Sequence, residues 1–195
     1  MTELNNKPNI KQANVCPPLQ KDASGLDKLA YWLGIGLGSG KPKKAPGTWG
    51  SLFGLLFAIP LMMLGFVPFL VITVLANVVG IWICDKTSHL MGVHDDPHIV
   101  WDEWAGMWIA LLPYAYYMGS HDFYTLANLP VLLILLANTF VLFRIFDIFK
   151  PFPIGYLDKK LSGGFGIMLD DMLAGAIVAI IMLFCLTFVV AVGLN

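Results

Sequence analysis

Residues 172–192 read MLAGAIVAIIMLFCLTFVVAV and contain no charged side chain. A transmembrane helix needs about 20 consecutive apolar residues, because an α-helix rises about 1.5 Å per residue and the hydrocarbon core of a bilayer is about 30 Å thick. This segment is long enough to cross. It predicts a membrane-spanning helix and so sets the class of fold for the rest of the chain.

Upstream of it, residues 51–83 are nearly uncharged and too long for a single pass. Pro60, Gly65 and Pro68 interrupt this stretch. Because proline and glycine mark helix ends and turns, we expect two helices joined near residues 65–68.

Two further apolar segments lie between these helices and the last one. The segment 104–118 is short for a full span, and we expect it to tilt or to thin the bilayer locally. The next runs from about residue 126 to 143, with His121 and Asp122 in the turn before it.

The composition agrees with a membrane protein. Hydrophobic residues make up 57% of the 195 residues, charged residues 13%, and the mean hydropathy is +0.73. A soluble domain is roughly a quarter charged. We therefore predict an all-α, polytopic membrane helical bundle with about five hydrophobic helices and a short interfacial N-terminal helix over residues 29–37.

Residues 1–28 are polar and lack the order of features that defines a signal peptide. We expect a polar N-terminal tail that could be disordered, followed by a single membrane-embedded domain over residues 29–195. Cys16, Cys84 and Cys185 have no paired spacing, so no disulfide framework is predicted. A net charge of −1 gives no support to a nucleic-acid partner, and no obligate protein partner is implied.

With five passes, the segments before residue 51, between 84 and 103, and between 144 and 171 fall on one side of the membrane. That side receives all 12 Lys and Arg residues, so the positive-inside rule makes it cytoplasmic. Of the 13 Asp and Glu residues, Asp122 alone falls on the opposite side. The sequence thus predicts a polar site at the cytoplasmic face.

Three clusters of polar residues face that side. The first, MGVHDDPHIVWDE (91–103), places Asp102 and Glu103 in the first turn of the third helix, after His94 and His98. A helix dipole favours acids at this position, but two adjacent acids beside histidines exceed a capping role.

The second cluster, FRIFDIFKPFP (143–153), spaces Arg144, Asp147 and Lys150 three residues apart, on one face of a helix. A surface ion pair with a snorkelling lysine is the simpler interpretation. The apolar residues around Asp147 favour instead an inward-facing polar site.

The third cluster, SGGFGIMLDDMLAG (162–175), is expected to form a flexible glycine approach followed by Asp170 and Asp171 at the start of the last helix. Backbone N–H groups of a glycine-rich loop can hold phosphate. Adjacent carboxylates repel unless one is protonated or a cation lies between them, and oxygen ligands favour Mg²⁺ over zinc.

A basic segment, GLGSGKPKKAPGTWGSL (36–52), precedes the first pass. Lys41 and Thr48 could hold an anionic head group, although a basic run beside a membrane also serves topology and anionic lipid. One membrane face thus carries carboxylates for a divalent cation, an Arg, a Lys and a glycine loop. Together these groups indicate phosphoryl chemistry, with a carboxylate as base or nucleophile.

Four stretches together resemble the phosphatidylglycerophosphatase A family: GSGKPKKAPGTWGSL (38–52), MGVHDDPHIVWDEWAGMW (91–108), FRIFDIFKPFPI (143–154) and GGFGIMLDDMLAG (163–175). The resemblance implies a Mg²⁺-dependent enzyme of the bacterial inner membrane that converts phosphatidylglycerophosphate to phosphatidylglycerol. The family's pattern often has His before the Gly-Gly pair, where this chain has Ser162. The family's polar positions correspond to Thr48, His94, Asp95, Asp102, Glu103, Arg144, Asp147, Lys150, Asp170 and Asp171.

These residues give a hypothesis for the site. The expected Mg²⁺ ligands are Asp102, Glu103, Asp170 and Asp171, and Asp147 joins them in the catalytic set. The expected substrate-binding residues are Lys41, Thr48, His94, Arg144, Lys150, Gly163 and Gly164.

Three other functions were weighed against this one. A transporter would place ionisable groups near the bilayer midplane, whereas the acids here lie at helix ends. A CDP-alcohol phosphotransferase also pairs membrane helices with Asp and Mg²⁺, but its repeated-Asp signature within one helix is not reproduced. A noncatalytic scaffold leaves the clustering of polar residues unexplained.

Overall fold

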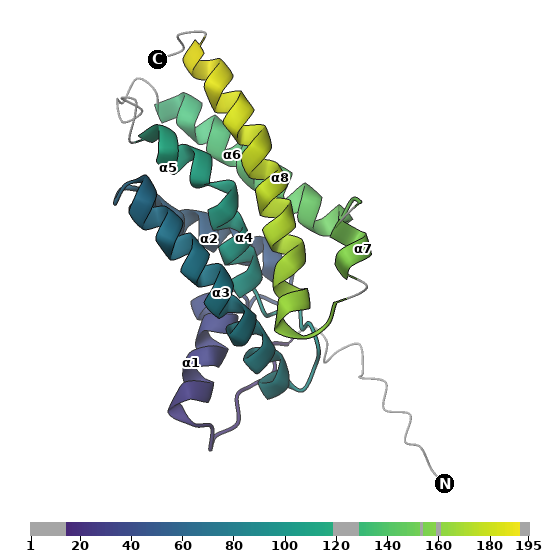
Figure 1. Cartoon of the computed structure of the whole chain (residues 1–195). Coiled ribbons are helices and arrows are strands. Elements are labelled where there is room, and N and C mark those ends of the chain that lie inside the picture. Colours follow the sequence, from purple (N-terminus) through teal and green to yellow (C-terminus); the bar gives the residue numbers. More distant parts are fainter. Residues whose placement is uncertain (1–14, 119–128, 153, 159–160, 192–195) are drawn as a thin grey trace.

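The computed structural model describes residues 15–118, 129–152, 154–158 and 161–191, and every element in these ranges is a helix (Figure 1). This confirms the predicted all-α architecture. In chain order the elements are α1 (Gly25–Gly34), the 3-10 helix η1 (Gly36–Gly38), α2 (Pro46–Met62), α3 (Phe66–Met91), α4 (Trp101–Ala110), α5 (Leu112–Met118), α6 (Leu129–Phe149), α7 (Ile154–Asp158) and α8 (Gly163–Ala191).

Among the described helices, α3, α6 and α8 are long and apolar enough to cross a membrane, and α2 is a shorter apolar helix. The predicted break between the first two hydrophobic helices is confirmed. It includes Gly65, whose φ of 98° is a backbone conformation that glycine adopts without a steric penalty. The turn predicted around His121 and Asp122 lies outside the described residues.

The expected single helix over residues 104–118 is wrong. α4 ends at Ala110, Leu111 separates the two helices, and Pro113 occupies the first turn of α5. Proline has no backbone N–H to donate and its ring clashes with the carbonyl four residues earlier, here that of Ile109. The segment therefore forms two short helices instead of one tilted span.

Three helices extend well beyond their apolar segments. α3 continues to Met91, past the expected end at residue 83, and α6 continues to Phe149, past residue 143. α8 begins at Gly163, whereas we expected the helix to begin near residue 172. Hydropathy marks where a helix meets the bilayer surface, but the helix itself ends at capping residues such as Gly92, with a φ of 70°. Many of the charged residues therefore lie on helices.

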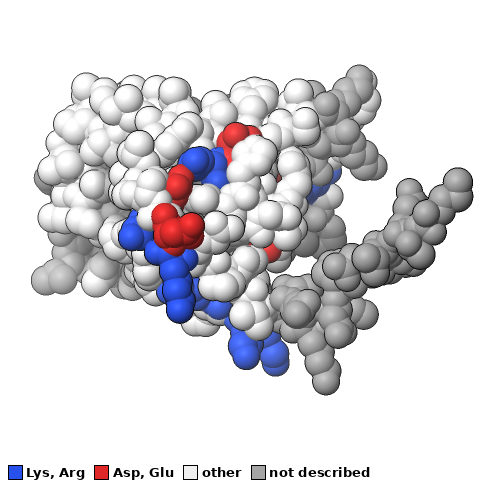
Figure 2. All heavy atoms as spheres, turned by 90° about the horizontal axis from the view of Figure 1, so that it is seen from below, with Lys and Arg blue, Asp and Glu red and all other residues white. Residues whose placement is uncertain are grey.

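These extensions meet at one end of the molecule. α1, the C-terminal part of α3 and the N-terminal part of α8 lie together there (Figure 1), and basic and acidic side chains gather on this end, which we call the charged end (Figure 2). Lys86 of α3 forms an ion pair of 2.8 Å with Asp27 of α1. The charged residues of the candidate site are therefore expected at this end.

α4 lies inside the bundle, in contact with α2, α3 and α8. Its tryptophans hold it there. The indole Nε1 of Trp101 donates to the carbonyl of Ala76 in α3 at 3.1 Å, and that of Trp108 donates to the carbonyl of Gly54 in α2 at 2.8 Å. Two neighbouring helices thus fix the rotation of α4 about its axis and the direction of its polar first turn.

Two glycines bring α4 and α8 into backbone contact. A Cβ on Gly106 would lie 2.6 Å from the carbonyl oxygen of Asp171, and one on Gly175 would lie 2.3 Å from the carbonyl oxygen of Gly106. Because residues four apart share a helix face, this approach also brings the first turn of α4 next to the side chain of Asp171.

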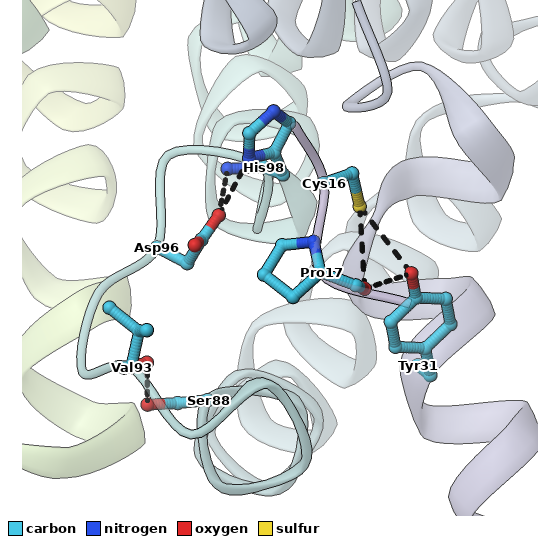
Figure 3. A network of polar contacts seen from close by, with 7 residues as sticks. All are labelled: Cys16, Pro17, Tyr31, Ser88, Val93, Asp96 and His98. Carbon is cyan, nitrogen blue, oxygen red and sulfur yellow. Dashed lines mark hydrogen bonds and ion pairs between the residues drawn. The ribbon is translucent and has the colours of Figure 1, made fainter. Parts of the chain in front are cut away.

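The described N-terminal segment packs against the charged end. α1 begins at Gly25, inside the segment expected to be tail, and Ser24 and Asp27 form its capping box. Upstream of it, the hydroxyl of Tyr31 donates to the carbonyl of Pro17 at 2.7 Å, and the Cys16 thiol lies 3.4 Å from the same hydroxyl (Figure 3). Cys16 and Pro17 are therefore in contact with α1.

Candidate active site

Three carboxylates converge at the centre of the charged end. Asp102 and Glu103 come from the first turn of α4 and Asp171 comes from α8. One oxygen of each lies within 4.8 Å of the other two. Asp102 is 7% exposed and Asp171 is 2% exposed. We call this group the acidic trio.

The acidic trio is electrostatically unfavourable as it stands. Burial, reinforced by the charges of Glu103 and Asp171, raises the pKa of Asp102 well above its usual value. Burial also raises the pKa of Glu103 to about 7, although a hydrogen bond with Asp102 and the nearby Arg144 oppose the rise. A bound cation would remove this repulsion without protonating the acids.

The hydrogen bonding of the trio also fits a cation. Within the described part of the chain, Asp102 Oδ1, Glu103 Oε2 and Asp171 Oδ1 are buried and have no hydrogen-bond partner. Buried polar atoms are nearly always satisfied, so three unsatisfied carboxylate oxygens at one point call for a ligand. Carboxylate oxygens are what hard divalent cations prefer.

Arg144 of α6 lies beside the trio. Its guanidinium Nη1 forms an ion pair with Asp147, one turn along α6, and lies 3.9 Å from Glu103 Oε1. The side chains of Arg144 and Asp147 are only 15% and 13% exposed, so the pair is not the exposed surface pair of the simpler interpretation. The predicted common helix face of these two residues is confirmed.

The first turn of α2 closes the site on another side. Arg144 Nη1 donates to the hydroxyl of Ser51 at 3.1 Å, and that hydroxyl donates to the carbonyl of Gly47 at 2.9 Å. A Cβ on Gly47 would lie 2.3 Å from Glu103 Oε1 and 3.3 Å from Arg144 Nη2. A side chain at this position would therefore displace the carboxylate of Glu103. Thr48, half-buried, is the next residue of the same turn.

Lys150 and Asp170 form a second ion pair of the site, at 2.5 Å between Nζ and Oδ2. Lys150 follows the last residue of α6 with a positive φ of 42°. Asp170 was expected to join the metal ligands, but the structure pairs it with a cation and the trio does not include it. Adjacent residues of a helix point about 100° apart, so Asp170 and Asp171 cannot share one partner readily.

The expected glycine loop is wrong, because Gly163 and Gly164 form the first turn of α8. The N–H of Gly163 donates to His94 Nε2 at 3.0 Å, and the N–H of Gly164 donates to Asp85 Oδ1 at 3.0 Å. A Cβ on Gly164 would lie 1.9 Å from the carbonyl oxygen of Ile81. These glycines therefore let α8 start against α3, with two side chains capping the helix.

Two other candidates, Lys41 and His98, lie apart from the acidic trio. Lys41 Nζ lies 4.2 Å from the ring centroid of Trp32, in a different part of the charged end. His98 is buried, and its Nδ1 lies 2.7 Å from Asp96 Oδ1 (Figure 3). This contact shapes the loop before α4.

Sequence reasoning missed several contributors. Ser51 orients Arg144, Asp85 caps α8, and Gly106 and Gly175 set the distance between α4 and α8. The spacing of Gly47 and Ser51, four residues apart in a helix, could have indicated a shared face. Asp85 gave no signal, because it follows an apolar run in a segment that we expected to be a loop.

Comparison with known proteins gives a consistent result. Residues 30–186 match the family described as Phosphatidylglycerophosphatase A. The phosphatidylglycerophosphatase A of Haemophilus influenzae is 46% identical over 159 residues, 81% of this chain and 88% of that protein. The phosphatidylglycerophosphatase A of Escherichia coli is 38% identical over 171 residues, 86% of this chain and 91% of that protein.

A Bacteroides thetaiotaomicron protein provisionally named as a phosphatidylinositol-3-phosphatase is 35% identical over 157 residues, 75% of this chain and 87% of that protein. No solved structure gives a significant match. The family match spans α4, α6 and α8, which carry the acidic trio and Arg144. The chain therefore belongs to the phosphatidylglycerophosphatase A family.

Proposed function

We propose that the protein is a Mg²⁺-dependent lipid phosphatase, which hydrolyses phosphatidylglycerophosphate to phosphatidylglycerol and phosphate in bacterial phospholipid synthesis. The observation that carries the proposal is the acidic trio, with three buried unsatisfied oxygens, next to the guanidinium of Arg144. A cation site beside a phosphate-binding cation is what phosphoryl transfer needs.

Asp102, Glu103 and Asp171 would hold Mg²⁺ through carboxylate oxygens. When bound, the ion would polarise the phosphoryl group and balance the negative charge on its oxygens. Asp170 is the weaker candidate ligand of the four expected from the sequence, because it forms an ion pair with Lys150.

Two cations would bind the phosphate. Arg144 is held by Asp147 and Ser51, and its Nε is buried without a hydrogen-bond partner among the described residues. A guanidinium fixed on two sides offers its remaining donors to phosphate oxygens at little entropic cost. Lys150, held by Asp170, would bring a second positive charge.

In the reaction, water adds to phosphorus, the ester P–O bond breaks, and the glycerol oxygen of the lipid leaves with a proton. A site carboxylate would accept a proton from the water and return it to the leaving oxygen. Asp147 and Asp170 are each engaged by a cation, and we assign them the positioning of Arg144 and Lys150. Thr48, which follows Gly47 in the first turn of α2, would border the phosphate.

We place the site at the cytoplasmic face of the bacterial inner membrane. The relatives named above are bacterial, and the sequence puts its Lys and Arg residues on the side of the predicted site. The charged end would then face the cytoplasm, with α3, α6 and α8 crossing the bilayer.

The transporter alternative loses support. Among the described residues, the polar side chains buried in the middle of α3 and α6 are Thr73, Asn77 and Thr139, and none is charged. The buried acids of α8, Asp170 and Asp171, lie in its N-terminal part. The amide of Asn77 donates to the carbonyl of Thr73 at 2.8 Å, and Thr139 donates to the carbonyl of Leu135 at 2.9 Å. The middle of these helices thus lacks the buried charges expected of a transport pathway.

The direct test is phosphate release from phosphatidylglycerophosphate by the detergent-purified full chain, with Mg²⁺ and with excess chelator. We expect release with Mg²⁺ and none with chelator, and we expect Asp171→Asn to be inactive while still inserting into membranes. Folded wild-type protein that releases no phosphate under these conditions would refute the proposal.

A further inference from the structure

A cavity of about 610 Å³ opens at the charged end, between α1, η1 and the N-terminal part of α2. Its lining includes Trp32 of α1, Leu37 and Ser39 around η1, Lys41, and Trp49 and Phe53 of α2. None of these residues belongs to the trio or to the Arg144 and Lys150 pairs. We call it the Trp32 cavity.

Its lining combines aromatic side chains with a cation. Trp32 and Trp49 are each 45% exposed, and Lys41 Nζ lies 4.2 Å from the ring centroid of Trp32. Half-exposed tryptophans are typical of the boundary between lipid and water. A lysine ammonium binds phosphate as a point charge. The cavity thus offers one anionic position beside an apolar one.

The apolar part continues along α2. Phe53 and Phe57, one and two turns beyond Trp49, are 39% and 44% exposed, so the cavity opens onto an aromatic face of an apolar helix. The ring of Phe57 packs 4.7 Å from that of Trp104 in α4. Acyl chains of a lipid bound in the cavity could follow this face toward the bilayer core.

The cavity and the acidic trio are connected through short paths. The Ser39 hydroxyl, which lines the cavity, accepts a hydrogen bond of 3.2 Å from Nε1 of Trp104, the residue after Glu103. On α2, Trp49 faces the cavity, and Gly47 two residues earlier lies against Glu103 and Arg144. Trp49 and Gly47 belong to the same turn of α2, so the cavity and the trio border one turn of this helix.

The proposed substrate carries two phosphates, a terminal monoester and an inner phosphodiester, joined by one glycerol unit. We propose that the Trp32 cavity binds the phosphodiester of the substrate lipid, with Lys41 pairing with its charge, while the terminal phosphate reaches Arg144. The inference rests on the proposed function for the position of the terminal phosphate. It assigns the cavity to an anionic glycerophospholipid.

Binding without turnover tests the cavity by itself. The probe is phosphatidylglycerol, which keeps the phosphodiester but lacks the terminal phosphate, added to the detergent-purified full chain and measured by native mass spectrometry. Zwitterionic phosphatidylcholine serves as the comparison lipid. We expect phosphatidylglycerol to bind more tightly, and Lys41→Gln to weaken its binding about tenfold, as expected for the loss of one charge-assisted hydrogen bond.

Lys43→Gln is the matched control, because Lys43 is an exposed lysine of the same basic segment that is not among the described residues lining the cavity. It should leave binding nearly unchanged. Equal weakening by both variants would show general attraction between a basic surface and anionic lipid, and would overturn the proposal. Trp49→Ala removes an aromatic side chain that lines the cavity, and it should weaken phosphatidylglycerol binding even with Lys41 present.

Steady-state kinetics then test whether the cavity binds the substrate itself. For phosphatidylglycerophosphate, Lys41→Gln should raise KM about tenfold with little change in kcat. An unchanged KM would overturn the proposal even if phosphatidylglycerol binding were weakened. Asp171→Asn should still bind phosphatidylglycerol in a Lys41-dependent way. If the wild-type chain bound phosphatidylglycerol in this way but released no phosphate from phosphatidylglycerophosphate, the proposed function would be refuted and the cavity would remain a lipid site.

Discussion

Gly175 of α8 lies against Gly106 of α4 so closely that a Cβ on Gly175 would lie 2.3 Å from the carbonyl oxygen of Gly106. The contact stands one turn from Asp171 on α8 and one turn from Asp102 and Glu103 on α4. The two glycines therefore set the distances within the acidic trio, although neither can bind a ligand through a side chain.

The first prediction follows from this contact. Gly175→Ala should push α4 and α8 apart, lowering stability by about 1–3 kcal/mol and activity by about 100-fold, because shifts near 1 Å are costly for catalysis. Phosphate release and the thermal unfolding midpoint measure both effects. Gly25→Ala in α1 is the control, since its Cβ would meet nothing within 4 Å. Wild-type activity in Gly175→Ala would show that the trio tolerates this displacement.

The second prediction concerns the shape of the Arg144 side chain. Arg144→Lys keeps the charge but cannot contact Asp147 and Ser51 while binding phosphate, so kcat/KM should fall about 100-fold. Ser51→Ala removes one orienting hydrogen bond and should cost less than about tenfold. If the lysine variant matched wild-type activity, charge alone would suffice at this position.

The third prediction separates metal binding from catalysis. Without substrate, Mg²⁺ should raise the unfolding midpoint of the wild-type chain, since a ligand that binds the folded state stabilises it. Asp102→Asn and Asp171→Asn should lose this rise. Asp22→Asn, which changes an exposed acid, should retain it. A full Mg²⁺-dependent rise in both trio variants would place the metal elsewhere.

The fourth prediction concerns pH in the presence of chelator. The pKa of Glu103 is raised by burial to about 7, above its usual 4.5, so the folded state binds this proton more tightly than the unfolded state does. Stability should therefore fall as pH rises from about 4.5 to 7. The raised pKa of Asp102 should extend this fall to higher pH.

Added Mg²⁺ takes the place of the protons, and it should restore the unfolding midpoint more at pH 8 than at pH 5. Thermal unfolding across this pH range, with chelator and with Mg²⁺, measures the effect. A midpoint that rises with pH in the metal-free chain would contradict the burial of these acids.

The sequence predicted those features that depend on local pattern. Apolar runs located the hydrophobic helices, Gly65 marked the break between α2 and α3, and the three-residue spacing placed Arg144 and Asp147 on one face. These features follow from hydropathy and helix periodicity, and both can be determined from the residues of one segment alone.

What the sequence did not predict depends on contacts between distant segments. Four acids looked equivalent as metal ligands, and only the packing of α8 turns Asp171 toward α4 and Asp170 toward Lys150. The helical start at Gly163 depends on caps from His94 and Asp85, which lie far upstream. The break at Leu111 did have a local signal, Pro113, which the hydropathy of the segment obscured.

The division of the acidic trio between α4 and α8 has a consequence for biogenesis. During synthesis α4 reaches the membrane long before α8, so the growing chain must carry Asp102 and Glu103 at the bilayer surface without their third partner. No part of the chain that stops short of α8 can assemble the trio. Under the proposed function, the protein should therefore gain phosphatase activity only once α8 has docked on α4.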